Sequence, residues 1–122
     1  MIDLVDVQSS TFSTASIGTN AIVDGRCRLL MVIARQAHGV AENTASPVSL
    51  RTGASDETIR YKFSFPTDNN VTWDISINQV WSIGGSGVLF EDGMYYSKDE
   101  SAAACADMVT VVSTGGKDSV PT

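Results

Sequence analysis

The residues of this chain that could form a nucleophile and its base are two cysteines and a single histidine. Cys27 adjoins an apolar run, Cys105 lies in an alanine-rich segment, and His38 is separated from both in the sequence. A thiol nucleophile requires a base within hydrogen-bond reach, whereas free cysteines are most often small buried hydrophobic side chains. We therefore expect Cys27 and Cys105 to be structural residues.

Carboxylates that could serve as a general acid and base include two adjacent pairs, 56–57 and 91–92. Neighbouring residues of a strand point to opposite faces, so neither pair converges on one substrate. We interpret all four as solvated acids of turns. Because the chain also lacks the G-x-S-x-G and H-E-x-x-H motifs, we predict no catalytic residues and a protein that is not an enzyme.

Metal and phosphate sites are equally disfavoured by the residue types and their spacing. The glycine-rich residues 84–87 have no lysine near them and precede a strand, which predicts a wide turn and not a phosphate loop. The acidic and amide residues 68–70 lack the ligand spacing of an EF-hand, and one His with two distant Cys cannot complete a zinc site. We expect no metal and no cofactor.

Length and charge limit the classes of protein further. The chain has 122 residues and a formal charge of −6, so we expect one domain that does not bind nucleic acid through its phosphates. The longest apolar run, 29–34, is far shorter than the roughly 20 residues of a membrane helix, so we expect no membrane span. The acidic N-terminus is unlike a secretory signal, which predicts a protein that is not secreted.

A strand-rich chain would have to position these side chains. Valine, isoleucine and threonine are abundant, and these β-branched types favour sheets. Apolar and polar residues alternate strictly over 58–65 and again over 71–77, with Pro66 and the polar residues 68–70 between them. This pattern predicts an antiparallel hairpin with one buried face.

The remaining elements are predicted from shorter signals. The run 28–35 fits either a buried strand or a buried helical turn, because it has no usable period. An Asp-Gly pair at 92–93 favours a tight turn between two strands. The predicted short strands are 48–50, 88–90, 94–96 and 108–113.

One segment has a helical pattern. Ser97 and Glu100 match a capping box, and alanines follow them. We predict a short helical insert near 98–106, with a structured loop as the alternative.

These elements together predict an all-β fold, a single antiparallel β-sandwich or jelly-roll-like domain. Residues 1–17 are predicted to be an N-terminal arm, because 8–16 are too polar to form core. The β-sandwich domain is predicted over 18–113, and a flexible glycine-rich C-terminal tail over 114–122.

Aromatic residues indicate where a partner could bind. Trp73 is in phase with the buried face of its predicted strand, whereas Trp81 lies outside the clean alternation. Tyr95 and Tyr96 are adjacent, so one of them faces outward in a strand. We predict Trp81 and one of these tyrosines at an interface, where aromatic residues are enriched.

The segment 85–96 has a glycine turn, a strand, an Asp-Gly turn and an aromatic strand, and residues 108–112 close it with a V-T-V strand. With the apolar run 28–34 and the short strand and glycine turn at 48–53, this order resembles a group of small tailed-bacteriophage virion proteins. The resemblance implies a non-enzymatic β-sandwich, and within that group a capsid decoration or cement protein. Such a protein binds the outside of the head shell and stabilises contacts between capsomers.

The resemblance also implies partners and a location. The partners would be the major capsid protein and further copies of this chain, in a small oligomer that is often a trimer in this group. The location would be the capsid exterior, after assembly in the host cytoplasm. An exchange of the N-terminal arm between neighbours would add a strand or apolar anchors to the next subunit. The predicted interface residues are Ile2, Leu4, Val5, Phe12, Trp81, Tyr95 and Tyr96.

Two alternatives to decoration remain open at this point. The protein could be a tail or neck adaptor, which is the same kind of role at another position in the particle. It could also be a host- or glycan-binding β-sandwich module that presents exposed aromatic residues on its loops.

Overall fold

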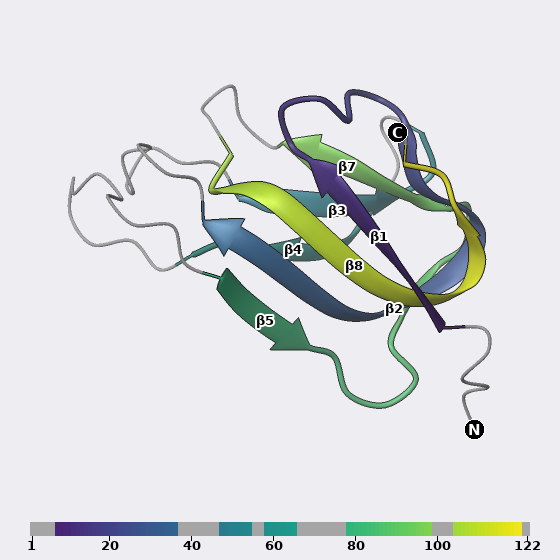
Figure 1. The fold of residues 1–122 in the computed structure, drawn as a ribbon. Helices are drawn as coiled ribbons and strands as arrows, with labels where there is room; N and C mark the ends of the chain where they lie inside the picture. Colours follow the sequence, from purple (N-terminus) through teal and green to yellow (C-terminus); the bar gives the residue numbers. More distant parts are fainter. Residues whose placement is uncertain (1–6, 37–46, 55–57, 66–77, 99–103, 121–122) are drawn as a thin grey trace.

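The computed structural model describes residues 7–36, 47–54, 58–65, 78–98 and 104–120 (Figure 1). None of these residues is in a helix, and the predicted all-β class is confirmed. The strands are β1 (Val7–Ser13), β2 (Ala21–Gln36), β3 (Val48–Thr52), β4 (Ile59–Phe63), β5 (Asn78–Ser82), β6 (Val88–Phe90), β7 (Met94–Lys98) and β8 (Ala106–Asp118).

The eight strands form one antiparallel sheet in the order β1-β8-β2-β7-β3-β4, and β5 and β6 also pair with β2. The run 28–35, for which strand and helical turn were both open, is the central part of β2. In β4 the predicted alternation is present, because Arg60 and Lys62 are exposed while Phe63 is buried. The second strand of the predicted hairpin, 71–77, lies outside the described residues.

The segments β5, β6 and β7 lie one after another along the same edge of β2. They pair with residues 31–35, 27–29 and 21–23 respectively, and each is antiparallel to β2. The Asp-Gly turn before β7 is therefore present but does not form a hairpin, because β6 and β7 both pair with β2 and not with each other. The interruptions between these segments come so close to β2 that a side chain would not fit at Gly87 or Gly93.

The sheet curves so that its two halves face each other across one core. The rings of Phe12 on β1 and Tyr96 on β7 are 5.6 Å apart between centroids, and those of Phe63 on β4 and Trp81 on β5 are 4.7 Å apart. Neither pair of strands is hydrogen-bonded, so these contacts cross the interior. In Figure 1, β8 and β2 pass in front of β3 and β4. Each large side chain buried here contributes roughly 1.5–3 kcal/mol to folding.

The predicted helical insert near 98–106 is not seen. Lys98 is the last residue of β7, where it pairs with Val48, and Ala106 is the first residue of β8, where it pairs with Gln36. Residues 99–103 lie outside the described residues. Alanine is the best helix former, but helix propensity is a weak preference, and the sheet outweighs it by burying Ala106 completely and pairing its backbone.

Both ends of the chain contribute strands to the sheet. Every residue of β1 pairs with β8, and Ser10 and Phe12 are 1% exposed, so the expectation that 8–16 are too polar for the core is wrong at these positions. At the other end, β8 continues past the predicted strand end at 113 and pairs with β2 as far as Asp118. The division into arm, domain and tail stays a prediction, but residues 7–13 and 114–118 belong to the sheet.

Candidate interaction surface

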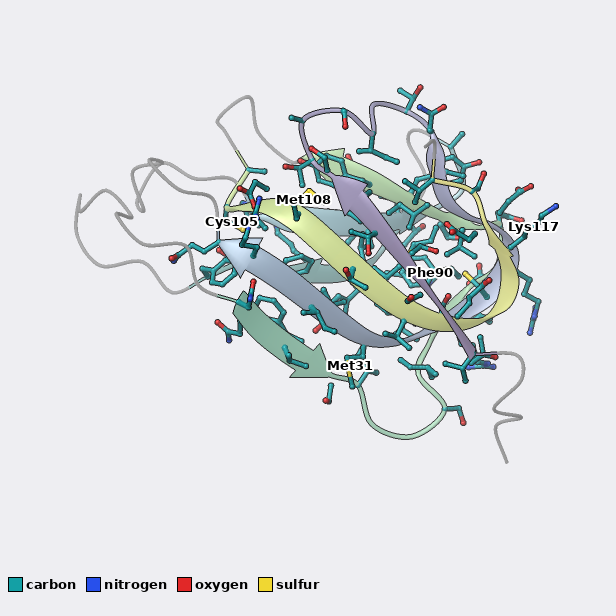
Figure 2. All side chains as sticks on the ribbon, viewed as in Figure 1. Met31, Phe90, Cys105, Met108 and Lys117 are labelled. Carbon is teal, nitrogen blue, oxygen red and sulfur yellow. The ribbon has the colours of Figure 1, made fainter. Side chains whose placement is uncertain are left out.

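The two thiols that could have been nucleophiles are buried. Cys27 is 2% exposed and Cys105 is fully buried at the position labelled in Figure 2. Burial raises the pKa of Cys27 to about 11 and also raises the pKa of Cys105. Both thiols are therefore uncharged near neutral pH and pack as small hydrophobic side chains, as expected. His38 lies outside the described residues.

The acidic turn before β7 is linked to two other strands by hydrogen bonds. Glu91 accepts a hydrogen bond from Arg60 of β4 at 2.7 Å, and the backbone N–H of Asp92 donates to Thr52 of β3 at 2.9 Å. The pair 91–92 thus ties the turn to two strands. The other acidic pair, 56–57, and the polar residues 68–70 lie outside the described residues.

Within the described part of the chain, no three His, Cys, Asp or Glu side chains come close enough to hold a metal ion. The glycine-rich residues 84–87 form the predicted turn, which lies between β5 and β6.

Four of the predicted interface residues can be placed. Phe12 is buried in the core of its own chain, and Tyr96 packs against it. Trp81 is half-buried against Phe63 and Phe65, with ring centroids 4.7 and 5.5 Å away. Tyr95 is half-buried beside a cavity of about 130 Å³. Ile2, Leu4 and Val5 lie outside the described residues.

A different set of residues lies on the side of the sheet that faces away from the core. We use the term outer face for the side of β5, β2, β8 and β1 that points away from the core. Strand register places side chains on it in rows across the four strands. The central row is Val80, Ile33, Thr110 and Thr11; the flanking rows are Ser82, Met31, Val112 and Ser9, and Asn78, Arg35, Met108 and Ser13.

The apolar side chains of the outer face are Val80 of β5, Met31 and Ile33 of β2, and Met108 and Val112 of β8, and its β1 residues all carry hydroxyl groups. Val80 is 53% exposed, and Ile33, Met31 and Val112 are half-buried without being part of the core cluster. Met31 and Met108, labelled in Figure 2, extend from β2 and β8. Neighbouring apolar side chains on an exposed sheet surface make it a candidate protein-binding surface.

Within the three rows named above, the charged side chain is Arg35, at one corner. Arg35 donates two hydrogen bonds to the carboxylate of Asp107, at 2.9 and 3.1 Å, and this pairing raises the pKa of Arg35. Next to it, the hydroxyl oxygens of Thr11 and Thr110 are 2.7 Å apart. The ion pair is exposed, so it contributes little to stability.

No local pattern in the sequence predicts the outer face. Residues 29–34 are all apolar, and a bulge at Leu30 in the pairing of β2 with β8 shifts the alternation of the strand. Burial alternates from Val32 to Gln36 in the structure, but the residue types there do not alternate, so the sequence carries no local signal of the outer face.

Comparisons with protein-family models, with curated proteins and with solved structures find no match to this chain. The described residues contain no helix with the length and hydrophobicity needed to cross a bilayer.

Proposed function

We propose that this protein is a non-enzymatic structural protein of a tailed-bacteriophage particle, and specifically a capsid decoration or cement protein on the outer head shell. Its partners are the major capsid protein and further copies of itself. The resemblance of 85–96 and 108–112 to small virion proteins supports the phage assignment. The observation that carries the binding role is the outer face, with the exposed Val80 beside Ile33 and Met31.

The rest of the molecule is compatible with this role. The two facing halves of the curved sheet support the β-sandwich that the resemblance implies. A net charge of −6 suits a protein on the outside of a DNA-filled shell, since like charge keeps its surface soluble and away from the nucleic acid. The position on the capsid exterior follows from the same proposal.

The first test is the copy number and position of the protein in particles encoded by the same genome, measured by quantitative mass spectrometry and antibody labelling. Hundreds of copies on the head would support decoration. A dozen copies or fewer at the neck or tail would replace decoration with the adaptor role. Absence from the particle would overturn the proposal, and binding to a glycan array would then favour the glycan-binding alternative.

The second test places a charge on the outer face. Val80→Lys should weaken binding to head shells that lack the protein by roughly tenfold or more, because the charge must be buried against the capsid. The matched control is Ala54→Lys, which adds the same charge at an exposed turn position away from the outer face. Equal binding by both variants in a sedimentation assay would remove the outer face from the proposal.

A further inference from the structure

The strand β1 has one backbone edge that no described strand covers. It is the first strand in the sheet order and pairs only with β8. Just after β1, the N–H of Thr14 donates to the carbonyl of Asp107 at 3.1 Å, in the same register as the β1–β8 pairing. Hydrogen-bonded positions alternate along an antiparallel ladder, so Gln8, Ser10 and Phe12 direct their backbone groups toward β8.

The backbone groups of Val7, Ser9 and Thr11 therefore point away from β8. The contact between the Thr11 and Thr110 hydroxyls supports this parity, because side chains approach most closely at the positions that are not hydrogen-bonded. Among the described residues, no backbone group from outside β8 hydrogen-bonds to Val7, Ser9 or Thr11. Ser9 and Thr11 are also exposed, so water reaches this edge.

The edge of β1 lacks the features that usually block pairing with another strand. Charged side chains and prolines protect sheet edges, and β1 has neither. The strand at the opposite end of the sheet order, β4, exposes Arg60 and Lys62. The difference indicates that the β1 edge is compatible with a partner strand.

We infer that two copies of this chain pair through their β1 edges, antiparallel and related by a two-fold axis. With Ser9 opposite Ser9 of the second copy, Val7 lies opposite Thr11, so each outward-pointing residue faces another one. This arrangement supplies about six backbone hydrogen bonds. The uncharged strand is complementary to itself, so a second copy fits it without placing like charges opposite each other, although the chain has a charge of −6.

Pairing at β1 would join the two outer faces into one continuous sheet surface. Val80 would lie near each end of that surface, with the hydroxyls of Ser9 and Thr11 at its centre. The pairing involves no capsid, so it can be tested on the isolated chain and fails or holds separately from the proposed virion role.

The test measures dimerisation of the full chain by analytical ultracentrifugation over a concentration series. Ser9→Pro removes the outward N–H but no bond to β8, and should weaken the dimer by about tenfold or more, because each copy loses a donor. Ser9→Ala keeps the N–H and should dimerise like the wild type. Circular dichroism checks that each variant is folded.

A charge-swap pair keeps the test decisive if the proline variant unfolds. Ser9→Lys and Ser9→Glu each place like charges opposite each other at the two-fold axis and should be monomers, whereas an equal mixture should form a mixed dimer. The inference would be overturned if the wild type is a monomer or a trimer. It would also be overturned if the mixture of Ser9→Lys and Ser9→Glu forms no dimer. If the wild type is a monomer and still binds head shells, the proposed function holds without the pairing at β1.

Discussion

Gly87 shows how closely one residue of this protein can be constrained. Its φ is +83°, and an added Cβ would overlap the carbonyl oxygen of Leu29 and lie 2.9 Å from a methyl carbon of Leu30. Gly84, in the same turn, has no positive φ and nothing within 4 Å of an added Cβ. Gly87 lets the chain leave β5 and return to β2 at β6, whereas the surroundings of Gly84 do not require a glycine.

We therefore predict that Gly87→Ala lowers the free energy of unfolding by about 1–3 kcal/mol, through backbone strain and the clash with β2. Gly84→Ala should change it by less than about 0.5 kcal/mol. Urea denaturation of both variants measures the difference. Equal stabilities would mean that the close approach at Gly87 is not a constraint.

Three hydroxyl groups are buried without a hydrogen-bond partner among the described residues. They belong to Ser10, Ser113 and Tyr96. The average composition of the serine-rich segment predicts an exposed arm. Side chains alternate between the two faces of a strand, however, so every second residue of β1 faces the core once β1 pairs with β8. The average polarity of the segment therefore does not show which of its alternate positions are buried.

The strand β1 is an integral part of the fold, although its sequence is mostly polar. Its inward side chain Phe12 is 1% exposed and meets Tyr96 from the opposite half of the sheet. We predict that Phe12→Ala lowers the free energy of unfolding by about 3–5 kcal/mol, because it leaves a cavity in the core. Ser9→Ala, at an exposed position of the same strand, should have little effect. A small loss for Phe12→Ala in thermal denaturation would show that β1 is not required by the core.

The long strand β2 organises the remaining elements. It pairs with β8 on one edge and with β5, β6 and β7 in succession on the other. A strand of 16 residues can satisfy two long ladders at once, and its bulges against β8 allow the sheet to twist around the core. The bulge at Leu30 shifts the alternation within the apolar run of β2, which is why the run shows no simple period.

For the molecule as a whole, buried ionisable groups determine how stability depends on alkaline pH. Burial raises the pKa of Cys27 from 9.0 to about 11. Burial, with a smaller contribution from Cys105, raises the pKa of Tyr96 from 10.0 to about 12. A folded-state pKa above the unfolded value means that the folded state holds the proton more tightly.

Stability from these two groups is fully present below about pH 9 and decreases as the pH rises through about 11 and 12. We predict that Tyr96→Phe lessens this decrease by on the order of 1–2 kcal/mol, because the group that ionises in the unfolded chain is removed. Denaturation midpoints from pH 7 to 11.5 measure it, with Ser9→Ala as the unaffected control. An unchanged pH dependence would contradict the assignment to Tyr96.

Local patterns were sufficient for the strand-rich class and for several elements. Alternation predicted β4, the Asp-Gly turn predicted the break between β6 and β7, and the V-T-V run predicted the middle of β8. Cysteine burial also followed from residue type. Each of these features depends on steric preferences between neighbours in the chain, which the sequence displays directly.

Strand pairing, and with it the candidate surface, depended on residues far apart in the chain. Ala106 is in a strand because Gln36 pairs with it, β6 and β7 lie end to end because both pair with β2, and Ser10 is buried because β1 pairs with β8. The outer face likewise exists only where Val80, Ile33 and Thr110 come into register. A strand satisfies its backbone with whichever partner the whole core brings beside it, and that choice is made by the packing of distant segments, which no local pattern encodes.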